Sequence, residues 1–272
     1  MLWEATGVQI QGTTALVTGA TGGLGQAIAR ALQARGATLV LTGRRADVLE
    51  PFAADLGARA IVADVSDRGA AEALAAEAGD VDILVANAAL PADGPLAEYT
   101  PEQIERALDV NLGVPIHLTH VMAPGMVARS RGHLVYVSSQ SGLVATPGSS
   151  LYSATKFGLR GFAWGMREDL HGSGVGVTTV LPGPIADAGM FAETGAELPK
   201  VVRQRRPEDV GNAVVRGIER NRIEIQVSDI PMMVGSRLGG VAPGLVSALN
   251  RRVGAGDVAA AVSGSDAHRS KR

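Results

Sequence analysis

Tyr152 and Lys156 are the residues whose types and spacing best suit acid–base chemistry. They stand four residues apart in YSATK (152–156), in a chain with only three tyrosines. On a helix, residues at this spacing project from one face. A free tyrosine has a pKa of about 10 and exchanges protons poorly at neutral pH. Because a nearby ammonium favours the phenolate, we expect Lys156 to lower the pKa of Tyr152. The same spacing also occurs in surface pairs without chemistry.

A glycine-rich stretch near the amino terminus could hold a diphosphate. TGATGGLG (18–25) joins an apolar run to a helical pattern, and its glycines give the spacing G-x3-G-x-G. Glycines let backbone amides approach phosphate oxygens, and a helix amino terminus adds partial positive charge. A tight turn is the alternative, but the position at the first strand–helix junction favours a nucleotide site. The expected cofactor contacts here are Gly19, Thr21, Gly22, Gly23, Leu24 and Gly25.

Two arginines stand where cofactor preference is set. Dinucleotide folds that prefer NAD carry a carboxylate on the ribose about twenty residues past the last glycine. Here that place holds Arg44 and Arg45, and the next acid is Asp47. A guanidinium suits a 2′-phosphate, which a carboxylate would repel. The sequence therefore favours NADP over NAD, with two solvated loop arginines as the alternative.

Two further strand ends carry polar side chains. Asp64 follows the third apolar run and could accept a hydrogen bond from the adenine amino group, although an ordinary polar strand end would look the same. Asn87 follows the fourth run in VANAAL. Its amide could pair with the backbone of neighbouring strands and form the floor of the cofactor site.

Apolar patterning places these residues on alternating strands and helices. Short apolar runs predict strands, and apolar residues at helical spacing predict helices. Pro51 is tolerated only if it lies in the first turn of its helix. The predicted strands are 14–19, 38–43, 58–65, 81–89, 133–139, 175–183 and 222–229, and the predicted helices are 22–36, 47–57, 67–79, 101–128, 151–172 and 207–221.

This alternation predicts an α/β fold: a doubly wound parallel sheet with helices on both faces, in a single domain. Parallel strands need long crossovers, which are right-handed. Near-continuous apolar strands agree, because such a sheet is buried on both faces. Ligands bind beyond the carboxyl ends of its strands. Residues 1–230 are assigned to the cofactor-binding and catalytic domain. Residues 231–272 form a C-terminal extension whose last residues we expect to be disordered.

Composition excludes other classes of protein. With 272 residues, 46% hydrophobic and 19% charged, the chain suits one globular domain. A net charge of −2 provides no basic field for nucleic acid. The absence of cysteine excludes disulfides and thiolate metal sites, and His117 with His120 lacks a third ligand, so no metal site is predicted. Without a secretory signal or an apolar run of membrane-spanning length, we expect a cytoplasmic protein that does not associate with membranes.

In their order along the chain, these motifs resemble those of the short-chain dehydrogenase/reductase family, over roughly residues 10–230. TGATGGLG is similar to the family's TGxxxGxG, and YSATK to its YxxxK. Asp64 and Val65 match its adenine-contacting pair. The remaining matches are Asn111 in DVNLG, Ser139 thirteen residues before Tyr152, and the PG motif in LPGPI (181–185).

Two departures stand out. ANAA replaces the family's NNAG, which changes local backbone detail and keeps Asn87. The family's frequent ending, a strand followed by NGG, is also missing, so the tetramer contacts often made there are not assumed.

The resemblance implies a Rossmann fold and reversible hydride transfer between NADP(H) and a carbonyl compound or secondary alcohol. Tyr152 would donate or accept the proton. Ser139 would hold the substrate oxygen, with Ser138 as the competitor. Asn111 would orient a water that relays protons through Lys156, which also binds the nicotinamide ribose.

Other parts of the site follow from the same resemblance. Pro182 and Gly183 would lie beside the nicotinamide, and the backbone of Ile185 would meet its carboxamide. Residues 186–200 align with a mobile lid, in which Met190, Phe191 and Leu198 suggest contact with an apolar substrate; an amphipathic surface helix is the alternative. The family also implies a homodimer, built on the helices at 101–128 and 151–172, or a homotetramer.

Two competing functions use the same fold. A non-catalytic NADP-binding regulatory protein would typically lose the tyrosine or lysine, and this chain keeps both. A methyltransferase could use the glycine-rich loop for S-adenosylmethionine, but YxxxK and the arginine pair would then have no role. The sequence does not distinguish between carbonyl substrates or between reaction directions.

Overall fold

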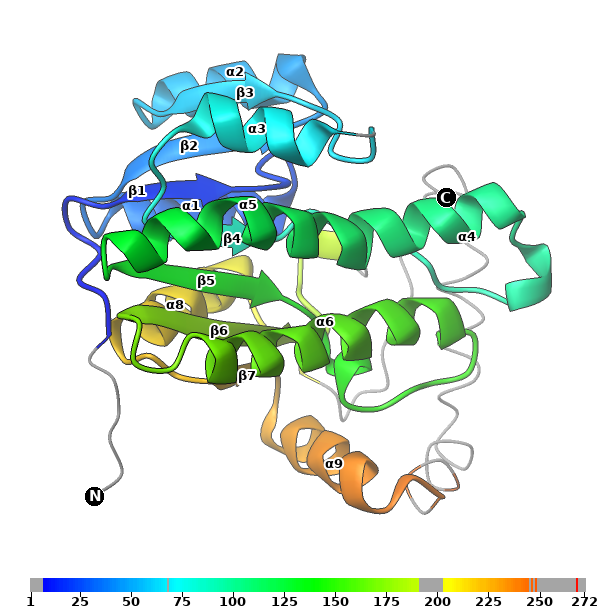
Figure 1. Cartoon of the computed structure of the whole chain (residues 1–272). Helices are drawn as coiled ribbons and strands as arrows, with labels where there is room; N and C mark the ends of the chain where they lie inside the picture. The colour runs from blue at the N-terminus through cyan, green and yellow to red at the C-terminus, as the bar shows by residue number, and fades with distance from the viewer. Residues whose placement is uncertain are drawn as a thin grey trace, which may run out of the picture.

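Parallel strands form one sheet at the centre of the molecule. The computed structural model describes residues 7–67, 69–190 and 203–244, together with 246, 248 and 268. In this part of the chain, seven strands pair in the order β3-β2-β1-β4-β5-β6-β7 (Figure 1). They are β1 Thr14–Val17, β2 Thr38–Gly43, β3 Arg59–Val62, β4 Ile83–Ala86, β5 Gly132–Val137, β6 Val175–Pro182 and β7 Glu224–Val227. The predicted doubly wound parallel sheet is confirmed.

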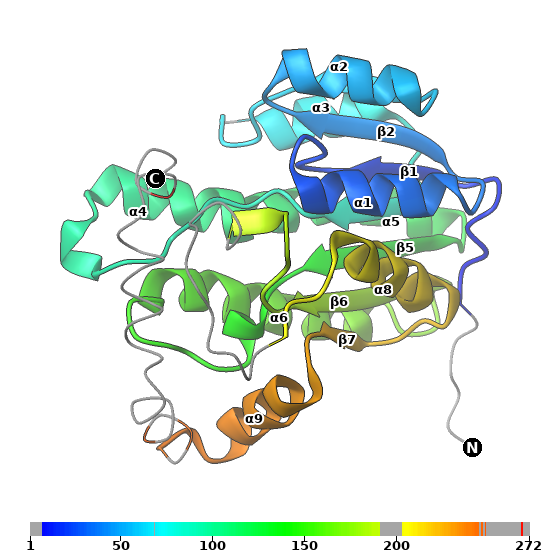
Figure 2. The same cartoon turned by 180° about the vertical axis from the view of Figure 1, so that it is seen from behind.

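Helices cover both faces of the sheet. Helices α1 (Gly23–Gln33), α2 (Ala46–Asp55) and α8 (Pro207–Glu219) pack on one face, and Figure 2 shows α1 and α8 in front of it. Helices α3 (Ala70–Ala78), α5 (Val114–Ala128) and α6 (Ser150–Asp169) pack on the other (Figure 1). Helix α4 (Pro101–Leu108) projects beyond the carboxyl ends of the strands, and α9 (Ile230–Val241) follows β7.

Along each strand, successive side chains pack alternately against the helices on one face of the sheet and those on the other. In β1, Ala15 and Val17 join the core beneath α1, α2 and α8, whereas Leu16 joins the core beneath α3, α5 and α6. All three are fully buried. Burial of a side chain such as Leu16 or Val17 stabilises the fold by about 1.5–3 kcal/mol, so the hydrophobic effect fixes the sheet between its helices.

The position of Pro51 differs from the sequence-based expectation. Helix α2 begins at Ala46, which makes Pro51 its sixth residue and places it beyond the first turn. The first-turn expectation is therefore wrong. Proline removes the helical hydrogen bond to the carbonyl of Asp47. Because Pro51 is exposed, water can replace that bond, and the helix tolerates the loss.

A π-helical turn divides the long helix predicted over 101–128. Helix α4 ends at Leu108, the π turn spans Asp109–Gly113, and α5 continues from Val114. Pro115 lacks the N–H that an α-helix would direct at the carbonyl of Asn111, so the regular ladder cannot continue there. Turns of this kind are frequent at functional sites, and this one holds Asn111.

Candidate active site

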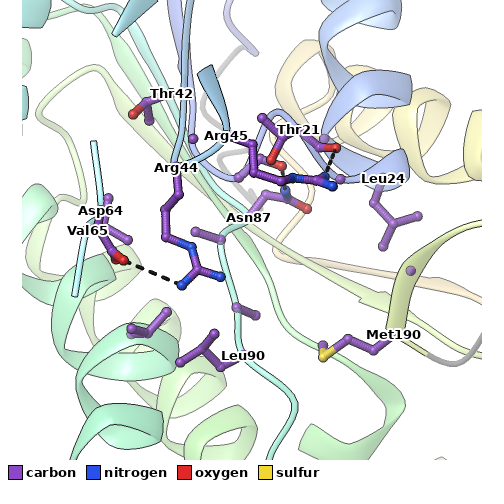
Figure 3. A pocket seen from close by; sticks show the side chains of 18 of the residues that line it. Thr21, Leu24, Thr42, Arg44, Arg45, Asp64, Val65, Asn87, Leu90 and Met190 are labelled. Atoms are coloured by element: carbon purple, nitrogen blue, oxygen red, sulfur yellow. Dashed lines mark hydrogen bonds and ion pairs between the residues drawn. The ribbon is translucent and has the colours of Figure 1, made fainter. Parts of the chain in front are cut away.

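A cavity of about 290 Å³ opens beyond the carboxyl ends of β1, β2, β3 and β4 (Figure 3). The strand order reverses between β1 and β4, and ligands of doubly wound sheets bind at such a switch point. The structure brings most of the predicted cofactor contacts to this cavity. Those that line it are Gly19, Thr21, Gly22, Gly23, Leu24, Gly25, Arg44, Arg45, Asp64, Val65 and Asn87.

The glycine-rich turn after β1 has the geometry of an anion cradle. Gly19 has a φ of 66°, and a Cβ placed on it would lie 2.8 Å from the Cα of Ala88. Helix α1 begins at Gly23. Its N-cap residue is Gly22, so no side chain of the N-cap residue accepts a hydrogen bond from the first-turn amides. The first-turn amides and the partial positive charge of the helix end are therefore available to an anion.

Asn87 holds the cradle to the next strand. Its Nδ2 donates to the main-chain oxygens of Thr18, at 2.9 Å, and Gly19, at 3.3 Å. Its backbone N–H donates to the hydroxyl of Thr18 at 3.0 Å. The side chain thus fixes the turn after β1 against the end of β4 and fills the floor of the cavity.

The two arginines after β2 point to different partners (Figure 3). Arg45 Nη2 donates to the main-chain oxygen of Thr21 at 2.8 Å, and Arg44 Nη1 lies 3.4 Å from Asp64 Oδ2. Both side chains are exposed. Their guanidinium groups therefore flank the cradle, one on the glycine-rich turn and one across the mouth of the cavity.

Asp64 is held in its ionised form at this mouth. Partial burial raises its pKa, but hydrogen bonds from Ser66 and the charge of Arg44 outweigh burial and hold the pKa below its ordinary value. Arg106 Nη2, on α4, lies 4.0 Å from the same carboxylate and also lines the cavity. Sequence reasoning missed Arg106, because only the fold brings α4 over the end of β3.

Tyr152 and Lys156 lie together on α6, buried beside the end of β5. Lys156 Nζ lies 5.5 Å from the centre of the Tyr152 ring and donates to the main-chain oxygen of Val137 at 3.2 Å. The side chains are 8% and 2% exposed. Because burial penalises the ammonium, the pKa of Lys156 falls from its ordinary value to about 8.

The expected lowering of the Tyr152 pKa is wrong for this structure. Burial raises the pKa of Tyr152 above its ordinary value, and the charge of Asp93 raises it further. The Ser139 hydroxyl, hydrogen-bonded to Tyr152, lowers the pKa but does not reverse the effect. Desolvation of the phenolate dominates in this buried position, so the Tyr152 hydroxyl is protonated at physiological pH.

The two serines at the end of β5 have different surroundings. Ser138 is buried, and its hydroxyl donates to the main-chain oxygen of Lys156 at 3.0 Å. Ser139 is half-buried, and its hydroxyl accepts from the N–H of Ser141 at 3.1 Å while facing Tyr152. Ser138 therefore anchors α6, and the hydroxyl of Ser139 is the one presented to the tyrosine.

Asn111 joins the π turn to the loop after β4. Its Nδ2 donates to the main-chain oxygen of Leu90 at 3.0 Å, and its Oδ1 accepts from the N–H of Leu90 at 2.6 Å. Nδ2 also lies 3.5 Å from Thr155 Oγ1 on α6. The fully buried amide thus ties the cavity wall to the helix that carries Tyr152 and Lys156.

The segment after β6 runs beside the same edge of the sheet. Gly183 N–H donates to Val227 at 2.9 Å, and a Cβ at Gly183 would lie 3.0 Å from the Cβ of Ser228. Ile185 is buried and bridges to Arg205 through the carbonyl of Pro184 and the N–H of Ala186. This bridge leaves the backbone groups of Ile185 itself unused.

The catalytic candidates do not line the cavity themselves. Ser139, Tyr152 and Lys156 are absent from its lining, as are the residues of the PG motif. Met190 connects the two parts, because it lines the cavity and packs against the apolar cluster that contains Tyr152. Phe191 and Leu198, expected to contact substrate, lie outside the described residues.

Two other kinds of site are absent from the described part of the chain. There, no group of three His, Asp or Glu side chains is arranged to hold a metal ion. His117 Nδ1 instead lies 3.7 Å from Glu72 Oε1. No helix among the described residues is long and apolar enough to cross a membrane.

The switch-point cavity, the glycine cradle and the buried tyrosine–lysine pair define a dinucleotide-dependent oxidoreductase as a class. A family model described as short chain dehydrogenase matches residues 13–199. The chain belongs to the short-chain dehydrogenase/reductase family, whose enzymes use nicotinamide cofactors and small-molecule substrates.

Named relatives and a solved structure agree with this family. The ketoacyl reductase HetN of Nostoc sp. is 34% identical over 82% of this chain and 81% of its own length. The NADP-dependent 3-hydroxy acid dehydrogenase YdfG of Salmonella typhi is 39% identical over 62% of this chain and 71% of its own. A serine dehydrogenase complexed with NADP+ superposes with a TM-score of 0.71 at 32% identity, over 80% of this chain and 95% of that one.

Proposed function

We propose that this protein transfers a hydride between NADP(H) and a carbonyl compound or secondary alcohol. The observation that carries the proposal is the buried pair of Tyr152 and Lys156 with the half-buried Ser139 facing it at the carboxyl end of β5. A purely structural role does not explain why a lysine is buried with no carboxylate bonded to it in the described part of the chain, while a serine hydroxyl faces a tyrosine. Such burial is costly, and it is frequent where proton transfer is needed.

The residues present fit a dinucleotide. The cradle at Gly19–Gly25 would hold the diphosphate, Asp64 and Val65 the adenine, and Lys156 the nicotinamide ribose. Pro182 and Gly183 would flank the nicotinamide, and the backbone of Ile185, which the bridge to Arg205 does not use, would meet its carboxamide. When bound, NADPH would supply the hydride.

The chain's own residues would manage the proton. In reduction, Tyr152 donates its hydroxyl proton to the substrate oxygen, and in oxidation its phenolate takes the proton back. Ser139 donates a hydrogen bond to the same oxygen and so holds the carbonyl beside Tyr152. Lys156 provides positive charge that stabilises the transient phenolate. Asn111 would act only indirectly on a water that returns a proton through Lys156, because its own amide is fully buried and bonded to Leu90 and Thr155.

Three observations support NADP in preference to NAD. Arg44 and Arg45 flank the cradle, and Arg44 Nη1 lies 3.4 Å from Asp64 at the adenosine end. Guanidinium groups suit the dianionic 2′-phosphate. One relative is named as NADP-dependent, and one structural neighbour was solved with NADP+.

The substrate is proposed to be apolar near its carbonyl. Met190 lies between the cavity and the cluster containing Tyr152, so an apolar side chain borders the reacting end of the site. Ketoacyl and 3-hydroxy acid chemistry in the names of relatives is compatible with this class.

A homodimer or homotetramer is also proposed. Exposed apolar side chains lie on α5 and α6, among them Val121, Val127, Phe157 and Trp164. Light scattering should give at least twice the 27.9 kDa mass of the chain, and a monomer at micromolar concentration would contradict the assignment.

The function is tested by following NADPH consumption, with NADH in parallel, across carbonyl compounds graded by size and apolarity. We expect turnover with NADPH that increases with substrate apolarity and is much weaker with NADH. Tight NADPH binding without turnover on any compound would favour the non-catalytic regulatory alternative.

A further inference from the structure

His268 links the C-terminal extension to the active-site region. It is 1% exposed, and its Nε2 lies 2.9 Å from the main-chain oxygen of Met190, 78 residues earlier in the chain. Since a carbonyl oxygen only accepts, Nε2 carries the proton in this contact and donates it. The imidazole therefore binds the main chain at a residue that borders the cavity.

Met190 borders both the cavity and the apolar cluster that contains Tyr152. In Figure 3 its side chain reaches the end of the cavity opposite Asp64, the end nearer to Leu24. The same side chain packs against the cluster that contains Tyr152 and Tyr99. A shift of the Met190 backbone would therefore change both the cavity wall and the packing beside Tyr152.

The segment leading to Met190 needs support from outside itself. Asp187 and Gly189 both have positive φ, 58° and 80°. Ala186 is held by a hydrogen bond from its N–H to Arg205, but this bond lies four residues before Met190. Only Gly189 and Met190 of this segment are helical, and Ala188 packs closely over Gly23, so a contact at the carbonyl of Met190 adds a second anchor at the far end of the segment.

We propose that His268 is a positioning residue of the active site. By donating to the carbonyl of Met190, it holds the Met190 side chain between the cavity and Tyr152, and it thereby sets the affinity for an apolar carbonyl substrate. This inference rests on the proposed function for its effect on substrate, although the contact itself does not depend on that function.

The test uses the full-length chain with His268→Ala, His268→Gln and the control His120→Ala. Gln can place a side-chain N–H near the position of Nε2, whereas Ala cannot. His120 is exposed on α5, so His120→Ala removes an imidazole of the same kind at a different place in the molecule. Two quantities are measured: amide hydrogen exchange of residues 186–190, and KM for an apolar carbonyl substrate beside the Kd for NADPH.

His268→Ala should speed exchange at 186–190 and raise KM by roughly 3–10-fold, the loss of one hydrogen bond. The Kd for NADPH should stay within about 2-fold, and His268→Gln should restore most of both effects. Unchanged exchange would overturn the contact, and faster exchange with an unchanged KM would overturn the positioning role. If no carbonyl compound is turned over at all, the proposed function fails, and the exchange rates still decide whether His268 holds this segment.

Discussion

Lys156 Nζ donates a hydrogen bond to the main-chain oxygen of Val137, 3.2 Å away, and so ties α6 to the last residue of β5. The ammonium is buried, without a carboxylate among its hydrogen-bond and ion-pair partners in the described residues. This arrangement places a positive charge beside Tyr152 at a cost in stability, because burial lowers the pKa of Lys156 to about 8.

Lys156→Met should therefore make the protein more stable while abolishing turnover. The unfolded chain binds this proton more tightly than the folded chain, so stability rises with pH between about 8 and 10.5. We expect the free energy of unfolding at pH 7 to increase by about 1–3 kcal/mol. The gain should shrink as pH rises through this window. Urea unfolding at pH 7 and pH 10 measures it, and a less stable variant at pH 7 would refute the burial argument.

Asp93→Asn should shift the pH dependence of alcohol oxidation. The charge of Asp93 raises the pKa of Tyr152, and oxidation needs the phenolate as proton acceptor. Removing the charge lowers this pKa, so the rise of kcat/KM with pH should move to lower pH. The control Asp55→Asn, on the exposed surface of α2, should leave the profile in place. Identical profiles for all three proteins would exclude an influence of Asp93 on Tyr152.

Arg44→Ala should weaken the binding of NADPH much more than the binding of NADH. A lost charge-assisted hydrogen bond to the 2′-phosphate corresponds to about 1.5–3 kcal/mol, or roughly 10–100-fold in Kd for NADPH. NADH lacks this phosphate, so its Kd should change by less than about 3-fold. Calorimetric titration of both cofactors measures the ratio, with Arg30→Ala on α1 as the control. Equal losses for NADPH and NADH would remove the 2′-phosphate assignment.

Gly19→Ala should impair both folding and cofactor binding. At Gly19 a positive φ coincides with a close approach to Ala88, whereas Gly12 has a φ of 72° and open space around its missing side chain. Gly12→Ala therefore reports backbone strain alone, about 1 kcal/mol. Gly19→Ala should cost at least about 1 kcal/mol more and abolish NADPH binding. Thermal unfolding with and without NADPH compares them, and equal stability losses would show that the cradle is not tightly packed.

The sequence predicted the sheet because its signals are local. Apolar runs such as 175–183 and helical spacing such as 22–36 depend on neighbours along the chain, and the glycine turn is placed by the junction between them. The positions of the residues that follow each strand can then be predicted as well, because parallel strands bring their carboxyl ends to one edge of the sheet. This is why the sequence alone predicts that Asp64 and Asn87 both contact the cofactor.

Other features depend on contacts between distant residues, and spacing does not reveal them. Desolvation reversed the expected pKa shift of Tyr152, and the influence of Asp93 requires knowledge of the loop after β4. Arg106 reaches Asp64 only because α4 crosses the cavity mouth. The π turn had a local signal, Pro115 four residues after Asn111, which an unbroken helical pattern concealed.

The most direct test of the central claim is to compare Tyr152→Phe with the unchanged protein in two assays, turnover with NADPH and a carbonyl substrate, and NADPH binding. Because phenylalanine keeps the buried ring and removes only the hydroxyl, the fold and the cradle should be preserved. We expect kcat to fall by at least about 1000-fold, consistent with the loss of a general acid, with the Kd for NADPH within about 3-fold. Turnover retained within about 10-fold would contradict the assignment of Tyr152 as the proton donor.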